Sequence, residues 1–323
     1  MARVLVAGGS GFIGTHMIRY LKSKGHYVVS ADIERPHYTL LEADTFVQAD
    51  LRDRKMAITL ALDADWVFNF AADMGGMGFI GNPDLQAQIL YNNTMIDFNL
   101  LEAARMAGVE RYFQASSVCV YPTSKLAVEH PAPLKEEDAY PAEPQGAYGW
   151  EKLQAEHLCR EYTIYGIKTH VARFQNVYGP YTAWKGGREK APAAMSRKIA
   201  RARYTGSEVD VWGDGKATRS FMYVDDCVRA VYDLMLTDYN APVTLGPDRS
   251  ISINELVTTI ATIAGVVVKV VHVNEGYQGV RGRAFDHTRC REVIGWVPST
   301  SIEAGMAATY PWIEEQVREE LAH

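Results

Sequence analysis

The stretch Gly8-Gly-Ser-Gly11-Phe-Ile-Gly14 decides the fold of this chain. It follows a short apolar run from Arg3 to Ala7 and opens a run from Phe12 to Lys24 whose apolar residues recur at helical spacing. The order is therefore strand, glycine-rich turn and helix. This order is typical of a dinucleotide-binding unit, whereas the glycine spacing alone is weak evidence.

Each glycine of this turn has a physical role in binding a pyrophosphate. Gly8 permits a tight turn, Gly11 lets the backbone approach the phosphates, and Gly14 lets the strand and helix pack closely. The free N–H groups at the helix N-terminus, which begins with Phe12 and Ile13, face the anion. We expect all five residues to contact a cofactor.

Two acidic residues further along select and place the cofactor. Asp32 ends a second strand, from Tyr27 to Asp32, where a carboxylate can hold both ribose hydroxyls and repel a 2′-phosphate. This favours NAD over NADP, although Arg35 nearby works against the preference. Asp50 follows the third strand and either contacts adenine or caps a helix before Arg52.

Strand and helix patterns alternate through the first half of the chain. The sequence predicts further strands and helices at Trp66 to Phe70, Thr94 to Ala107, Arg111 to Ser116, Gly149 to Tyr165 and Lys168 to Arg173. Repeated βα units predict an α/β, Rossmann-type, doubly wound parallel sheet with helices on both faces.

The rhythm changes after about Tyr178, where loop-forming residues interrupt the alternation. We expect an NAD-binding domain from residues 1–178 together with about 217–245. We expect a smaller, mixed α/β substrate-binding lobe from about 179–216 and 246–323.

Composition excludes several classes of protein. The 323 residues carry a formal net charge of −6, which is unfavourable for coating nucleic acid. The four cysteines lie far apart, so neither a metal site nor a disulfide framework is expected. The chain opens directly into a strand and holds no long apolar run, so we expect a cytoplasmic protein that binds no membrane.

Tyr148 and Lys152 stand four residues apart at the start of a predicted helix, so both side chains share one helix face. An ammonium group there lowers the pKa of the phenol and can hold the nicotinamide ribose. The phenolate can then accept a proton from a substrate hydroxyl. This pair alone is common on helix surfaces, but Ser116-Ser117 at a strand end and the glycine turn support a catalytic role.

These features resemble the extended short-chain dehydrogenase/reductase family of NAD-dependent epimerases and dehydratases. Phe221-Met-Tyr-Val-Asp-Asp226 and Gly295-Trp-Val-Pro298 strengthen the resemblance. It implies that NAD binds the first lobe, that a nucleotide sugar binds the second, and that two copies pair through the helices predicted at Thr94 to Ala107 and Gly149 to Tyr165.

Longer segments resemble one branch of that family, the GDP-mannose 3,5-epimerases. They include Ala71 to Gly78, Tyr91 to Met95, Pro141 to Gln145, Trp184 to Ala194, Trp212 to Gly215 and Thr218 to Phe221. The resemblance implies NAD-dependent 3,5-epimerisation of GDP-mannose to GDP-L-galactose through a transient 4-ketone, with no net redox change.

The resemblance also implies roles for individual residues. Tyr148, supported by Lys152, drives oxidation at C4, and Ser117 hydrogen-bonds the reacting hydroxyl. Cys119 and Lys190 move protons at C3 and C5; the order of the inversions and the base at each carbon stay open. Without the resemblance, Cys119 is a small packing residue and Lys190 a solvated lysine.

Further residues match family positions around the substrate. Gly75, Asn176 and Glu189 match positions near the sugar, and Lys198, Arg219 and Arg283 match positions near the diphosphate or nucleotide. On composition alone each charged member of this set is an ordinary surface charge or ion pair.

Two departures from related enzymes bear on the substrate and the reaction. Ala217 stands where the family usually has Gln, so a different GDP-sugar stays possible as the substrate. Val118 and Cys119 stand where dehydratases carry an acidic pair, which disfavours a dehydratase. A decarboxylase stays open, as does a 4-epimerase, which needs neither Cys119 nor Lys190. An NAD-binding sensor is disfavoured, because such proteins often lack the tyrosine or lysine retained here.

Overall fold

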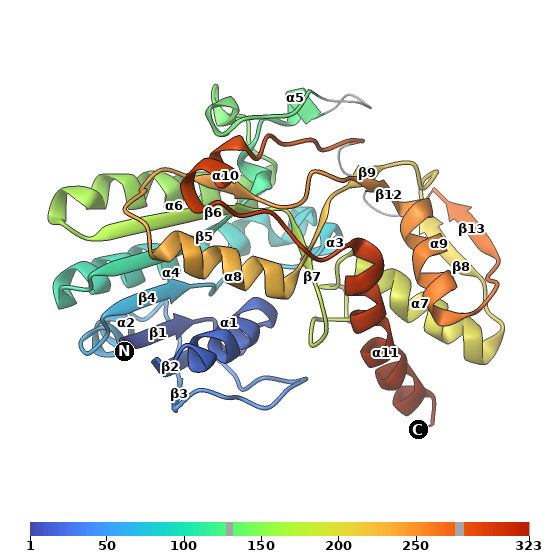
Figure 1. The fold of residues 1–323 in the computed structure, drawn as a ribbon, viewed down its shortest axis with the longest axis horizontal. Coiled ribbons are helices and arrows are strands. Elements are labelled where there is room, and N and C mark those ends of the chain that lie inside the picture. The colour runs from blue at the N-terminus through green and yellow to red at the C-terminus, as the bar shows by residue number, and fades with distance from the viewer. Residues whose placement is uncertain (127–131, 275–280, 323) are drawn as a thin grey trace.

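Seven strands form one parallel sheet in the order β11-β6-β5-β4-β1-β2-β3 (Figure 1). The computed structural model describes residues 1–126, 132–274 and 281–322. The strands of this sheet are β1 (Arg3–Ala7), β2 (Tyr27–Asp32), β3 (Thr45–Gln48), β4 (Trp66–Asn69), β5 (Arg111–Ser117), β6 (Lys168–Phe174) and β11 (Val243–Leu245). The predicted Rossmann-type α/β fold is confirmed.

Helices cover both faces of the sheet. One face packs against α1 (Phe12–Ser23), α8 (Val224–Met235) and α10 (Thr288–Ile294), and the other against α2 (Arg54–Ala61), α4 (Gln86–Ala107) and α6 (Gly146–Tyr162). Apart from the edge strand β3, the strands are largely buried by these helices, which suits a parallel sheet covered on both faces. Met17, Ile18 and Leu234 fill one face, and Leu100 and Leu101 fill the other.

Two helices begin earlier than the sequence predicts. Helix α4 starts at Gln86, eight residues before the predicted Thr94, after a short turn at Pro83–Leu85 that Asn82 caps. Gln88 and Asn92 of its first turns line the cavity described below, and these polar residues interrupt the apolar spacing that marks a helix. Helix α6 starts at Gly146, three residues before the predicted Gly149.

A smaller lobe lies beside the large sheet (Figure 1). Its parallel pair is β8 (Val209–Trp212) with β13 (Val270–Val273), and its antiparallel pair is β9 (Thr218–Arg219) with β12 (Ile251–Ser252). Helices α7 (Ala191–Thr205), α9 (Ile253–Ala264) and α11 (Ile302–Leu321) build its core. A further parallel pair consists of β7 (Asn176–Tyr178) and β10 (Phe221–Tyr223). The short helices are α3 (Met77–Ile80) and α5 (Thr123–Leu126).

The chain returns to the first domain more often than the expected division allows. Helix α10 packs on α8 and β11, and Cys290 and Trp296 are buried in the core of the large domain. This segment therefore does not lie in the smaller lobe, where the expected 246–323 boundary puts it. Conversely, β9 pairs with β12 and belongs to the smaller lobe. Across the described ranges, no helix is both long enough and apolar enough to cross a bilayer.

Candidate active site

A cavity of about 1140 Å³ is lined by residues from the carboxyl end of the sheet and from the smaller lobe. Every site residue expected from the sequence lines it: Gly8, Gly11, Phe12, Ile13, Gly14, Asp32, Asp50, Gly75, Ser117, Cys119, Tyr148, Lys152, Asn176, Glu189, Lys190, Lys198, Arg219 and Arg283. This is the crevice in which open α/β sheets bind ligands. The contacts that each of these expected site residues makes with a ligand stay predictions.

The glycine turn at one end of the cavity has no room for side chains. Gly8 has a φ of +73°, and a Cβ there would lie 2.6 Å from the backbone nitrogen of Ala71. A Cβ on Gly14 would lie 2.1 Å from the carbonyl oxygen of Gly8. A Cβ on Gly9 would lie 2.3 Å from the hydroxyl oxygen of Ser30, which is a side-chain atom, whereas Gly8 and Gly14 meet backbone. The turn therefore fits the pyrophosphate of a dinucleotide.

Asp32 lies at the end of β2, where its carboxylate accepts a hydrogen bond of 2.9 Å from the backbone N–H of Ser10. Burial raises the pKa of this carboxyl, and the backbone donors oppose the shift. Arg35 does not contact Asp32 but stacks on the ring of Phe46, 4.6 Å from its centroid. The arrangement suits a ribose diol better than a ribose phosphate.

Asp50 forms a bidentate ion pair with Arg52, whose Nη2 is 2.6 Å from Oδ2. The residue that caps α2 is Asp53, because its carboxylate accepts a hydrogen bond from the N–H of Lys55. Asp50 is therefore not a helix cap. It lines the cavity with its carboxylate held by arginine.

Tyr148 and Lys152 are both buried on the first turns of α6. The ammonium of Lys152 lies 5.6 Å from the centroid of the Tyr148 ring. Burial raises the pKa of Tyr148, while the charge of Lys152 and a hydrogen bond with Ser117 lower it. The lysine thus counteracts the cost of ionising a buried phenol.

Cys119 lies in a short turn, Val118–Val120, that follows β5. Ser117 holds this turn by accepting a hydrogen bond from the N–H of Cys119 (3.2 Å). The thiol is buried and interacts electrostatically with Tyr148 from the same domain and with Lys190 from the loop before α7. The fold therefore joins three proton-exchanging groups across the two lobes.

Burial lowers the pKa of Lys190, which favours a neutral amine. The positive charge of Arg283 lowers it further, whereas a thiolate at Cys119 or Cys227 would raise it. The electrostatic interaction between Lys190 and Cys119 thus pairs an amine with a thiol, two groups that can carry protons. Such a pair can act as acid and base in turn.

The loop that carries Lys190 interlocks with the segment before α3. Arg188 donates one hydrogen bond to the carbonyl of Met74 and another to the carboxylate of Asp73, each with a length of 2.9 Å. A Cβ on Gly76 would lie 2.3 Å from the carbonyl oxygen of Glu189. The sequence alone did not predict this ion pair between Asp73 and Arg188. The two residues lie 115 positions apart, and no sequence pattern shows that such distant charges meet.

Two of the expected substrate contacts are tied to protein partners. Glu189 forms an ion pair with Arg197 (2.9 Å), and Lys198 forms one with Asp210 (2.6 Å). Asn176 donates to the carbonyl of Ser220 over 3.2 Å. These residues line the cavity, but Glu189 and Lys198 also have the internal ion-pair role that composition alone favours.

The half-buried Arg219 and the buried Arg283 bring two guanidinium groups to the smaller-lobe side of the cavity. Burial lowers the pKa of Arg219 to about 9, and the charge of Arg283 contributes to the decrease. Nη2 of Arg283 donates a hydrogen bond of 2.7 Å to Oε1 of Gln145, while no described residue accepts a hydrogen bond from its buried Nε. Two like charges held together in this way suit an anion such as a diphosphate.

Known proteins resemble the chain over nearly its full length. Residues 4–245 match the model of the NAD dependent epimerase/dehydratase family. A rice (Oryza sativa subsp. indica) protein named GDP-mannose 3,5-epimerase 1 is 46% identical over 98% of this chain and 83% of its own. The Arabidopsis thaliana GDP-mannose 3,5-epimerase is 43% identical over 99% and 84%, respectively.

Solved structures share the whole architecture. The UDP-glucose 4-epimerase of Thermotoga maritima, solved with UDP-glucose, superposes with a TM-score of 0.85 and 27% sequence identity. The match covers 98% of this chain and 99% of that protein. Both lobes are therefore those of a nucleotide-sugar epimerase fold.

Proposed function

This chain belongs to the NAD dependent epimerase/dehydratase family, and we propose that it converts GDP-mannose to GDP-L-galactose by inverting C3 and C5. The observation that carries the proposal is the meeting of Cys119 and Lys190 beside Tyr148 in one cavity. A 4-epimerase needs only the tyrosine; a double inversion next to a ketone needs two further proton carriers. The names of the rice and Arabidopsis relatives supply the substrate.

NAD is the cofactor, and the residues present fit it. The turn from Gly8 to Gly14 would hold its pyrophosphate, Asp32 its adenosine ribose, and Lys152 its nicotinamide ribose. When bound, NAD supplies a reversible acceptor for the hydrogen and electron pair on C4 of the sugar.

The protein's own groups move the protons. Tyr148 accepts the proton of the C4 hydroxyl, and Ser117 holds that hydroxyl in place. The resulting 4-ketone acidifies C3 and C5, because each carbanion is stabilised as an enolate. At each carbon one of Cys119 and Lys190 removes a proton, and the other delivers one from the opposite face. Reversal of the first step restores the alcohol.

The diphosphate would bind Arg219 and Arg283, whose charges repel each other until an anion lies between them. This binding orders the sugar against Cys119. Ala217 also lines the cavity, where a larger polar side chain is usual in the family. A second candidate substrate is therefore a related GDP-hexose that fills the extra space.

We also propose that two copies pair through α4 and α6. These adjacent helices carry exposed apolar side chains at Leu90, Tyr91, Phe98 and Trp150. Burial of such a patch stabilises association, so Phe98→Glu should yield monomers in light-scattering measurements.

The four cysteines are all free thiols, which suits the reducing cytoplasm that we propose as the location.

The test of the reaction is incubation with GDP-mannose in heavy water, followed by proton NMR. GDP-L-galactose with deuterium at C3 and C5 is the expected product. Parallel reactions with GDP-glucose and UDP-glucose test specificity. If GDP-mannose takes up no deuterium but another nucleotide sugar does, that sugar nucleotide is the substrate instead. If none of them takes up deuterium, the proposed reaction is rejected.

A further inference from the structure

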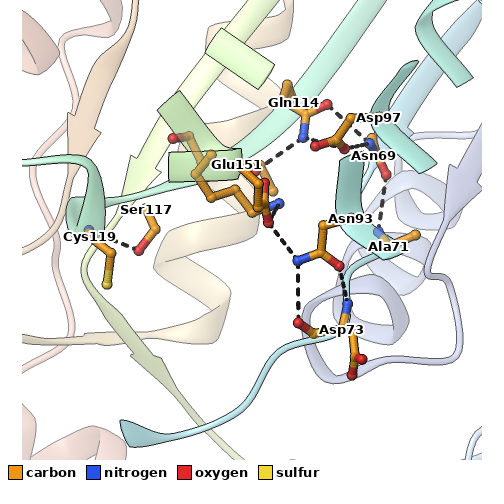
Figure 2. A network of polar contacts seen from close by, with 12 residues as sticks. Asn69, Ala71, Asp73, Asn93, Asp97, Gln114, Ser117, Cys119 and Glu151 are labelled. Atoms are coloured by element: carbon orange, nitrogen blue, oxygen red, sulfur yellow. Dashed lines mark hydrogen bonds and ion pairs between the residues drawn. The ribbon is translucent and has the colours of Figure 1, made fainter. Parts of the chain in front are cut away.

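A network of buried polar side chains includes Glu151, Asn93 and Asp97, on the side of Glu151 that faces away from Ser117 and Cys119 (Figure 2). Lys152 lies 3.2 Å from Oε1 of its sequence neighbour Glu151, which also accepts from the amide of Asn93 over 2.5 Å. Asp97 of α4 lies in the same network. Its Oδ1 accepts from Asn69 (2.8 Å) and Gln114 (3.0 Å).

The charges of this network do not balance. Two carboxylates, Glu151 and Asp97, interact with the single ammonium of Lys152, and all three groups are 0–3% exposed. No described residue donates to Oε2 of Glu151 or to Oδ2 of Asp97. Two ionised carboxylates that share one buried cation repel each other, so one of them favours its protonated form.

Both carboxyl groups can hold that proton. Burial raises the pKa of Glu151 to about 7; Lys152 opposes the shift, and the charge of Asp97 adds to it. Burial also raises the pKa of Asp97. Other titratable groups that interact with members of the network are Tyr148 and Cys159 from α6 and Tyr112 from β5. Asp73 contacts Asn93 through its backbone, while its carboxylate is held by Arg188.

The protonation state of Glu151 reaches the base of the reaction. An ionised Glu151 raises the pKa of Tyr148, whereas Lys152 lowers it. When Glu151 is protonated, the charge of Lys152 acts on the phenol without this opposition. Glu151 contacts Lys152 and Asn93 rather than the space where substrate reacts, so it acts through Lys152.

We propose that Glu151 is a positioning residue that shares one buried proton with Asp97 and thereby sets how strongly Lys152 stabilises the Tyr148 phenolate. The shared proton follows from the network alone. The effect on Tyr148 rests on the proposed function, in which Tyr148 is the base.

Infrared spectroscopy tests the shared proton without any turnover. With ¹³C-labelled glutamate, the wild-type protein should show the carbonyl band of a protonated buried carboxylic acid that titrates near pH 7 and is missing in Glu151→Gln. Asp97→Asn should move its midpoint to lower pH, because the charge of Asp97 favours protonation of Glu151. Glu161→Gln, an exposed change on the same helix, should leave the band unchanged. A band identical in wild type and Glu151→Gln would overturn the proposal.

Kinetics test the effect on Tyr148. In a Cys119→Ala background, cofactor reduction by GDP-mannose at each pH reports the oxidation step alone. Adding Glu151→Gln should move the rise of this rate to lower pH by about one unit, as expected for removal of one buried negative charge. Adding Glu161→Gln should not. An unshifted profile in the Glu151→Gln protein would contradict the role, even if its rate fell. No reduction in the Cys119→Ala protein at any pH would instead reject the proposed function and leave the infrared result standing.

Discussion

The carbonyl oxygen of Cys119 touches Gly149 so closely that a Cβ on that glycine would lie only 2.4 Å away. The same carbonyl accepts a hydrogen bond of 2.9 Å from the N–H of Gln145, just before α6. The first turn of α6, which carries Tyr148, is thus seated directly on the turn that carries Cys119. This contact fixes the oxidising group and the thiol relative to each other.

Gly149→Ala should therefore damage both stability and activity. The added methyl group meets backbone, which cannot rotate away, so we expect a loss of about 1–3 kcal/mol in urea unfolding. Activity should fall at least tenfold as Tyr148 and Cys119 separate. Gly78→Ala is the matched control for stability, because its Cβ would lie 3.8 Å from the nearest atom. Equal stability of the two variants would contradict the close contact.

Asp32→Asn should weaken binding of NAD about 10- to 100-fold, since hydrogen bonds from the ribose hydroxyls to a charged acceptor are lost. Binding of NADP should change less, because the repulsion of its 2′-phosphate is also removed. Calorimetric titration with each cofactor measures both effects. Glu42→Gln, an exposed change in the loop that follows β2, serves as the control. An unchanged affinity for NAD would show that Asp32 does not bind the ribose.

Asp73 and Arg188 should act as one unit. Asp73→Asn and Arg188→Gln each remove one partner of the ion pair that positions the loop of Lys190, so each should lower kcat/KM about 3- to 10-fold. The double variant should lose little more than either single variant. Losses that multiply would mean that the two side chains act independently of each other.

His170 should make the protein less stable in mild acid. Burial lowers its pKa to about 4, so the folded protein keeps the ring neutral while the unfolded chain takes up a proton below pH 6.5. The folded state therefore loses about 3 kcal/mol as pH falls from 6.5 to 4. His170→Gln should remove this part of the pH dependence in denaturant titrations, whereas His37→Gln, at an exposed site, should not. The same slope in all three proteins would contradict a buried neutral ring.

The sequence predicted the sheet and the cavity because both depend on local patterns. Glycines that no side chain can replace, such as Gly8 and Gly14, mark the turn, and the four-residue spacing of Tyr148 and Lys152 marks one helix face. The resemblance to known epimerases then supplied Cys119 and Lys190, which no spacing would have selected.

Further features depend on contacts between distant segments, which a single sequence does not reveal. Asp97 and Glu151 look like ordinary helix carboxylates until α4 and α6 bury them against Lys152. Helix α10 looks like part of the smaller lobe until Cys290 and Trp296 enter the core of the larger domain. Helix α4 is longer than predicted because Gln88 and Asn92 interrupt the apolar spacing near its start.

The most direct test of the proposed mechanism is one turnover of Cys119→Ala with GDP-mannose in heavy water, with cofactor absorbance and proton NMR followed together. Oxidation at C4 needs Tyr148 but not the thiol, whereas inversion at C3 and C5, which brings in solvent deuterium, needs both the thiol and Lys190. We therefore predict a reduced cofactor with deuterium incorporation at least about a hundredfold slower than in wild type, as for removal of a general acid–base group. Deuterium entering both carbons at the wild-type rate would show that Cys119 carries no proton and would contradict the mechanism.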